Sequence, residues 1–205
     1  MEQISPRQRR HQKTKAAILH TAQTLISEKG VQGLSLREIA RRIDYSPAGL
    51  YEYFKSKDEI IEAVCAEGFA QLNQYVTHIS ADLPPLERLI QLGLAYLDFA
   101  RNNPEHYMLI FTTLSEEKVS LNEINKPGST YHVLVEAVKA AIDAGEFTIP
   151  GEYSLTEIAY ILWAHVHGIA MLQQTQFRNS PHDFSTIHRW SLELFLKGLQ
   201  TNHQT

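Results

Sequence analysis

The stretch of residues 35–58 constrains this chain most, because it predicts two short capped helices that meet at a sharp turn. Ser35 stands where an N-cap is expected, and Glu38 follows three residues later at the spacing of a capping box. Apolar residues then recur at three- and four-residue steps, which predicts a helix over residues 36–43.

A second helix is predicted directly after the turn. Asp44 and Tyr45 supply the turn, and Asp tolerates the left-handed conformation better than most residues. Ser46 is a second N-cap, and Pro47 occupies the first helical position, where its missing N–H has no partner to lose. The start of this helix carries small residues, so it could enter the major groove of DNA closely, as the second helix of a helix-turn-helix does.

Charge divides the chain at about the same place. Residues 1–57 contain 11 Lys and Arg against 5 Asp and Glu, a net charge of +6, whereas residues 58–205 contain 8 against 18, a net charge of −10. A basic module can neutralise DNA phosphates, while an acidic remainder is repelled by them. This asymmetry favours a nucleic-acid partner for the N-terminal part and a different task for the rest.

In the two predicted helices and the turn between them, residues 35–58, the chain resembles the TetR family of transcriptional regulators. Two positions depart from the family pattern, because Asp44 stands where Gly is usual and Tyr45 where Val is usual. The resemblance is carried by Ser35, Ile39-Ala40, Asp44-Tyr45-Ser46, Leu50-Tyr51-Glu52-Tyr53-Phe54 and Lys57.

The resemblance implies a set of DNA contacts. Tyr51 and Lys57 match positions that contact phosphates, Lys55 lies close enough to help, and Arg37 matches a position that reads a base in some members. The expected DNA-binding residues are Ser35, Arg37, Ser46, Pro47, Ala48, Gly49, Tyr51, Tyr53, Lys55 and Lys57.

Three domains are predicted along the chain. Residues 1–13 form a flexible basic arm that either reaches the minor groove or only adds charge to the surface. Residues 14–57 form the helix-turn-helix DNA-binding domain, whose first helix covers residues 14–28 with Gly30 as its C-cap. Residues 58–205 form a helical domain for dimerisation and effector binding.

The fold class expected from this pattern is all-α, with three helices in the N-terminal domain and six in the C-terminal domain. Proline and glycine separate the later helices, and nothing alternates as a strand would. The polar stretch of residues 115–129 predicts a loop. The six later helices are expected over residues 58–80, 86–101, 104–114, 129–144, 154–175 and 184–200.

Length and composition agree with a cytoplasmic globular protein of one small and one medium domain. The chain has 205 residues, of which 43% are hydrophobic, and no run is long enough for a membrane span. Cys65 is the only cysteine, so neither an intramolecular disulfide nor a cluster of thiolates around a metal can form. We expect no cofactor, no metal and no membrane partner.

A motif late in the chain, Trp163, His167 and Gly168, resembles the Trp-His-Gly signature of one TetR subgroup. Trp163 and His167 share a helix face, and His167 is expected to act as a core histidine with one hydrogen-bond partner or, alternatively, to contact a ligand. The resemblance implies a pocket for a small apolar or aromatic effector, and the candidate lining residues are Tyr96, Phe99, Tyr107, Met108, Phe111, Tyr131, Trp163 and His167.

The last two helices predict a homodimer. They are apolar over so much of their circumference that a monomer would expose a large patch, although both helices could instead be central within one domain. Two such helices can meet their copies in a four-helix interface. The expected interface residues are Leu162, Val166, Ile169, Ile187, Trp190 and Leu194.

The sequence therefore predicts a ligand-responsive transcriptional regulator, most simply a repressor that binds a palindromic operator in double-stranded DNA as a homodimer. Two other classes stay open. One is an all-helical interaction module without DNA binding. The other is a small helical enzyme, although the sequence offers no nucleophile-base arrangement and no glycine-rich phosphate loop.

Overall fold

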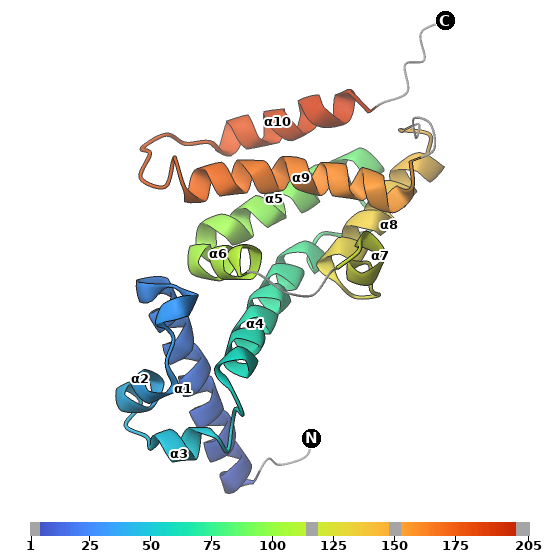
Figure 1. Cartoon of the computed structure of the whole chain (residues 1–205). Coiled ribbons are helices and arrows are strands. Elements are labelled where there is room, and N and C mark those ends of the chain that lie inside the picture. The colour runs from blue at the N-terminus through green and yellow to red at the C-terminus, as the bar shows by residue number, and fades with distance from the viewer. Residues whose placement is uncertain (1–4, 114–118, 148–152, 200–205) are drawn as a thin grey trace, which may run out of the picture. The chain divides into compact units, whose positions relative to one another are not determined.

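A computed structural model describes residues 5–113, 119–147 and 153–199. The described residues form ten α-helices and one short 3-10 helix, and no strand appears among them (Figure 1). The all-α fold class is therefore confirmed. The helices are α1 (Pro6–Lys29), α2 (Leu36–Arg42), α3 (Pro47–Leu50), α4 (Lys57–Thr77), α5 (Pro85–Asn102), α6 (Pro104–Thr112), α7 (Leu121–Ile124), α8 (Thr130–Asp143), α9 (Leu155–Gln174) and α10 (Ser185–Lys197), with the 3-10 helix η1 at Val31–Gly33.

The chain groups into two compact units. The first extends to Phe69 and also takes in the segment from Glu105, which is most of α6; the second contains Ala70–Pro104 and the helices from α7 onward. Helix α4 thus begins in the first unit and ends in the second. The sequence predicts residues 104–114 in the C-terminal domain. In the structure most of these residues belong to the first compact unit, with α1–α3.

The first unit is built around one apolar core. Leu109 of α6 contributes to it, which explains why α6 belongs to this unit. Burying these side chains is the main stabilising term, at roughly 25 cal/mol for each Å² of apolar surface removed from water. The core residues are Ile18, Leu19, Ala22, Leu25, Ile26, Leu34, Ile39, Ala40, Leu50, Phe54, Ile60, Ile61, Val64 and Leu109.

Local signals account for most of the helix ends in this unit. Gly30 has φ +70° at the end of α1, a conformation that L side chains rarely adopt. Asp44 has φ 57°, so the left-handed turn expected there is confirmed. The Ser46 hydroxyl accepts a hydrogen bond from the Gly49 N–H at 3.0 Å, which confirms the second cap.

Two local expectations are wrong. Ser35 is the N-cap residue of α2, but the predicted capping box does not form. The Ser35 side chain makes no capping hydrogen bond, and the Glu38 carboxylate is held by Arg41 and Arg42. The basic arm expected over residues 1–13 is helical from Pro6 onward. Ser5 and Gln8 form a capping box there and extend α1 by two turns.

In the second unit, α5 is the central helix and packs against α8, α9 and α10. Helix α10 approaches α5 closely at Gly93, where an added Cβ would lie 2.9 Å from Leu192. The Arg189 guanidinium also reaches the Glu87 carboxylate at 2.7 Å, so α10 is fixed to α5 by both packing and charge.

The predicted loop over residues 115–129 contains the short helix α7, while its first four residues lie outside the described part of the chain. Among the described residues, α9 alone is long and apolar enough to cross a membrane by length and composition. Core helices of soluble proteins pass the same test, and α9 packs against α5 and α8.

Candidate functional site

Helices α2 and α3 present the candidate DNA-binding surface. Ile39 and Leu50 are fully buried and fix the two helices to the core of the first unit. Gly49, Tyr53 and Lys57 are half-buried. The other predicted contacts are exposed, and they are Ser35, Arg37, Ser46, Pro47, Ala48, Tyr51 and Lys55.

An aromatic cluster lies around α3, and the sequence did not predict it. A Cβ on Gly49 would lie 2.6 Å from Cε1 of Tyr45, so this tyrosine ring packs directly on the glycine. The Tyr45 and Tyr53 hydroxyls are 3.5 Å apart, and this hydrogen bond raises the pKa of Tyr45. His11 of α1 stacks on Tyr53 with ring centroids 4.6 Å apart. Gly49 therefore has a role inside the protein. The exposed start of α3 is formed by Pro47 and Ala48, and Tyr51 is exposed directly after the helix.

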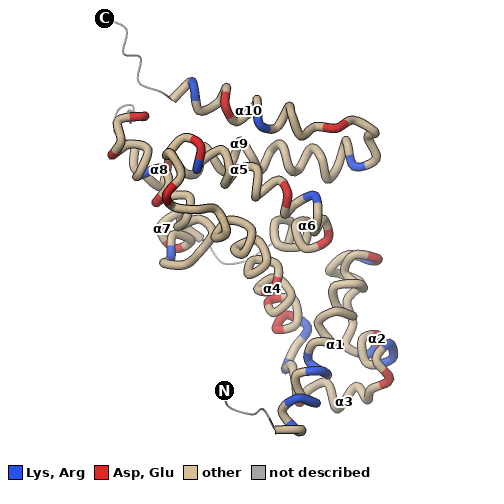
Figure 2. The backbone as a smooth tube through the Cα atoms, turned by 180° about the vertical axis from the view of Figure 1, so that it is seen from behind, with Lys and Arg blue, Asp and Glu red and all other residues tan. Residues whose placement is uncertain are grey.

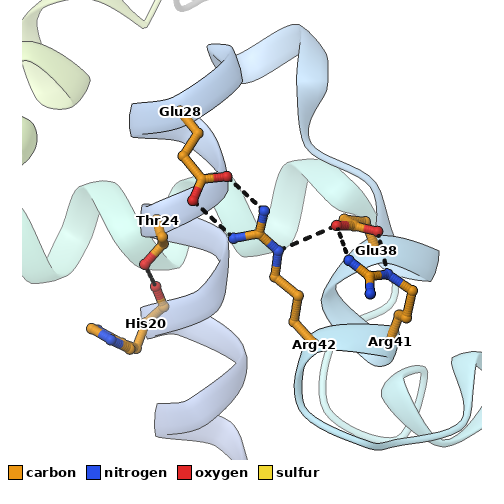
Figure 3. A network of polar contacts seen from close by, with 6 residues as sticks. All are labelled: His20, Thr24, Glu28, Glu38, Arg41 and Arg42. Carbon is orange, nitrogen blue, oxygen red and sulfur yellow. Dashed lines mark hydrogen bonds and ion pairs between the residues drawn. The ribbon is translucent and has the colours of Figure 1, made fainter.

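A charged network ties α2 to α1 (Figure 3). The Arg42 guanidinium donates two hydrogen bonds to the Glu28 carboxylate, at 2.6 and 3.1 Å, across 14 residues of sequence. Arg41 and Arg42 both donate to Glu38, and these hydrogen bonds, that of Arg41 first, lower the pKa of Glu38 to about 2. Two of the basic residues counted above therefore have carboxylate partners within the protein. No sequence signal pairs Glu28 with Arg42.

The start of α4 positions the two lysines expected at phosphates. The Ser56 hydroxyl accepts a hydrogen bond from the Glu59 N–H at 3.1 Å, while the Glu59 carboxylate accepts one from the Lys55 backbone N–H. These bonds fix the backbone on both sides of Lys57. The side chains of Lys55 and Lys57 can then approach an anion from a rigid base.

Basic residues collect at one end of the first unit. Figure 2 shows Lys and Arg along the early turns of α1 and at the start of α4, at the end of the unit that carries α3. The acidic residues of α4 follow further along the helix. A surface with this charge distribution attracts polyanions, and duplex DNA carries one charge per about 1.7 Å of its axis.

In the second unit, an aromatic cluster brings together four of the eight predicted pocket residues. The Tyr96 hydroxyl lies 2.8 Å from Nδ1 of His167 and accepts a hydrogen bond from the Trp163 indole N–H at 3.3 Å. The Tyr131 ring lies 5.9 Å from that of Trp163. The partner expected for His167 is therefore present and is Tyr96.

Burial makes this cluster neutral. It lowers the pKa of His167 and raises the pKa of Tyr131 to about 12. The cluster can therefore donate and accept hydrogen bonds but presents no formal charge. Among the described residues, no group of three or more His, Cys, Asp or Glu side chains is placed to hold a metal ion.

The remaining pocket candidates lie elsewhere. Phe99 is fully buried and packs edge-on against Tyr75, with ring centroids 5.6 Å apart, as a core residue does. Tyr107, Met108 and Phe111 are on α6 and belong to the first unit. Tyr107 is also fully buried and packs on Phe111 at 5.0 Å.

The outer faces of α9 and α10 differ from the predicted interface. Leu162 and Val166 are only 9% and 6% exposed, so they belong to the core of their own unit and offer no surface to a second copy. Gly168 has nothing within 4 Å of an added Cβ, so the described residues do not approach its backbone closely. Ile169 is half-buried. The large apolar side chains that are exposed on the two helices are Tyr160, Ile161, Leu172, Ile187, Trp190 and Leu194.

Two family models match this chain. Residues 18–64 match the model of the bacterial regulatory proteins of the tetR family, and residues 89–195 match a tetracyclin repressor-like C-terminal domain. The uncharacterized HTH-type transcriptional regulator YobS of Bacillus subtilis is 20% identical over 191 residues, which are 93% of this chain and 95% of that protein.

Solved structures show the same fold. A protein of unknown function from Rhodococcus sp. RHA1 superimposes with a TM-score of 0.74 at 23% identity, covering 91% of this chain and 95% of that one. A bacterial regulatory protein of the tetR family from Rhodococcus RHA1 gives a TM-score of 0.70 at 22% identity, covering 92% and 97%.

A capped helix-turn-helix in a basic unit, followed by an all-helical C-terminal domain, defines a DNA-binding transcriptional regulator. With both of its domains matched, the chain belongs to the TetR family. Regulators of this family are generally not enzymes.

Proposed function

We propose that this protein is a cytoplasmic, ligand-responsive repressor that binds a palindromic operator as a homodimer and leaves it when an effector binds. The observation that carries the DNA-binding part is the exposed, capped start of α3 within the basic end of the first unit. We also propose that residues 14–57 bind DNA and that residues 58–205 serve dimerisation and effector binding. We further propose that the chain belongs to the Trp-His-Gly subgroup, and the motif at residues 163–168 supports this assignment.

We assign the DNA contacts by exposure and chemistry. Tyr51, Lys55 and Lys57 contact phosphates, which positions the protein without reading sequence. Arg37 is exposed on α2 and carries a planar guanidinium that can bond two acceptors on a guanine edge. Ala48 meets thymine methyls, whereas Gly49 acts mainly by holding Tyr45.

The dimer is proposed to form through the exposed apolar side chains of α9 and α10. Trp190 and Leu194 are 61% and 53% exposed one turn apart on α10, and Ile187 precedes them on the same face. An isologous interface would cover these side chains on both copies and leave the two recognition helices related by a two-fold axis. Such an axis requires a palindromic site with half-sites about one helical turn apart.

The effector is proposed to bind beside the Tyr96, Trp163 and His167 cluster. Neutral hydrogen-bonding groups among aromatic rings suit an uncharged apolar or aromatic molecule with a polar end. A hundredfold loss of operator affinity requires a coupling free energy of roughly 2.7 kcal/mol between the two sites.

Selection of bound fragments from a genomic DNA pool tests the proposal, followed by a screen for small molecules that release the selected duplex. We expect a palindromic sequence and release by a neutral ligand. Trp163→Phe removes the indole donor and should weaken the response to that ligand while leaving operator affinity unchanged. Recovery of no preferred sequence would contradict the proposal.

A further inference from the structure

We propose that the early turns of α1, residues 6–17, are a phosphate-binding extension of the DNA-binding surface. The inference rests on the proposed operator binding and adds a contact region outside the helix-turn-helix. Its partner is the sugar-phosphate backbone of duplex DNA next to the half-site that α3 enters.

The early turns of α1 are not needed for the core of the first unit. Residues 5–17 are all exposed or half-buried, and the first buried residue of the helix is Ile18. At 1.5 Å per residue, the twelve residues before Ile18 carry the helix roughly 18 Å beyond the point where packing begins. The Ser5 and Gln8 capping box, with hydrogen bonds of 2.9 and 3.2 Å, supports their first turn, together with the Arg9 N–H bond to the Ser5 carbonyl.

The charge of this segment opposes its own helix. It contains five basic residues and no Asp or Glu. Cations near the beginning of a helix meet the positive end of the helix dipole, and like charges three or four residues apart repel each other. Arg7 and Arg10 have this spacing. An anionic partner would relieve both effects at Arg7 and Arg10. Glu28 and Glu38 play this part for Arg41 and Arg42 of α2 (Figure 3).

Two aromatic contacts fix the segment beside the residues that follow α3. His11 stacks on Tyr53, with an angle of 26° between the rings, and the Lys15 ammonium lies 5.3 Å from the centre of the Phe54 ring. Tyr53 stands between Tyr51 and Lys55, the two neighbouring phosphate contacts proposed above. Because Arg7 lies one turn before His11 on the same side of the helix, it continues this surface.

Charge complementarity and continuity therefore identify duplex DNA as the occupant. An arginine guanidinium can donate two parallel hydrogen bonds to one phosphate. Contacts of this kind carry no sequence information, so the segment should raise affinity for every duplex equally. Each lost phosphate contact should reduce the slope of log affinity against log salt by about 0.9.

The experiment compares the full-length protein with the variant Arg7→Gln, Arg10→Gln. A matched control, Lys29→Gln, Lys126→Gln, removes two positive charges at exposed positions far along the chain from the segment. Affinities for the selected operator and for a random-sequence duplex are measured between about 50 and 200 mM salt. Circular dichroism and thermal unfolding verify that each variant is folded.

We expect the salt slope of the Arg7, Arg10 variant to fall by about 1.8 on both duplexes, with roughly ten- to thirtyfold weaker binding near 150 mM salt. The control should keep the parent's slope. An unchanged slope in the Arg7, Arg10 variant would overturn the inference, as would an equal fall in the control. Failure of the parent to bind any duplex would instead refute the proposed function itself.

Discussion

The two units of this protein place their polar groups differently. In the first, charged side chains lie on the surface and pair with one another or form a basic end, as the Glu28, Glu38, Arg41 and Arg42 network shows. The second also has surface ion pairs such as Arg189 and Glu87, but it adds neutral hydrogen-bonding groups inside, as at Tyr96 and His167, and exposed large apolar side chains on α9 and α10. A basic end suits a polyanion, whereas an exposed apolar face suits another protein.

The largest effect expected from this comparison concerns the exposed apolar face of α10. Trp190→Glu places a charge at the centre of the proposed interface, where it would be buried without a partner. We expect the dimer to dissociate and operator affinity to fall by orders of magnitude, because both half-sites must be bound together. Sedimentation at micromolar concentration measures the first effect and a DNA titration the second.

Tyr153→Glu is the matched control, since Tyr153 is 55% exposed but lies before α9. It should leave both mass and affinity unchanged. A Trp190→Glu protein with the parent's mass and affinity would exclude this interface.

A second prediction distinguishes base recognition by Arg37 from phosphate contact by Lys57 in the DNA-binding surface. Arg37→Ala should weaken operator binding by roughly 1–3 kcal/mol and relax preference at one base pair. Lys57→Ala should weaken binding to all duplexes and reduce the salt slope by about one. Competition between operator and random DNA measures the difference. If both variants lose the same affinity for operator as for random DNA, Arg37 does not read a base.

A third prediction tests the aromatic support of α3. Gly49→Ala places a methyl group 2.6 Å from the Tyr45 ring, which must then move. We expect a loss of roughly 1 kcal/mol or more in stability, because overpacking forces side chains from their positions. The double variant Gly49→Ala, Tyr45→Val should recover much of it. Denaturant unfolding measures the stability of both variants. A double variant no more stable than Gly49→Ala would contradict the packing of Tyr45 on Gly49 as the cause.

The smallest effect near neutral pH comes from four histidines, of which His106 in the first unit is buried and three in the second unit are half-buried. Burial lowers the pKa values of His106, His165, His167 and His188 below 6.5. Their contribution to stability is complete above pH 6.5. It is lost as the pH falls, because the unfolded chain takes up protons first.

Denaturant midpoints should therefore decrease between about pH 7.5 and 5.5, and His167→Gln should make the decrease shallower. A midpoint that rises on acidification would contradict the assigned pKa directions.

Much of the first unit could be predicted because its signals are local. Ser46, Pro47 and Asp44 determine a cap, a helix start and a left-handed turn within four residues, and all three are confirmed. The predicted capping box of Ser35 and Glu38 was wrong, and the Glu38 carboxylate bonds Arg41 and Arg42 instead, a pairing that the cap pattern alone does not reveal. Periodicity also could not show that Tyr107 on α6 would join the first unit, since such a contact depends on the tertiary fold.

The second unit was harder to predict for a related reason. An apolar helix such as α9 gives no indication of which face is inside, so Leu162 and Val166 were assigned to an interface although they are buried. The hydrogen bond between Tyr96 and His167 joins residues 71 positions apart and has no sequence signal. What the sequence did provide was the number and order of the long helices.

In the proposed complex, two copies of this chain present their first units together to one palindromic duplex. A stoichiometric titration of the selected operator with the full-length protein, monitored by sedimentation under low salt, tests it most directly. We expect a complex of two chains per duplex, with affinity that falls steeply as salt increases. A complex with one chain per duplex, or no complex at low salt, would contradict it.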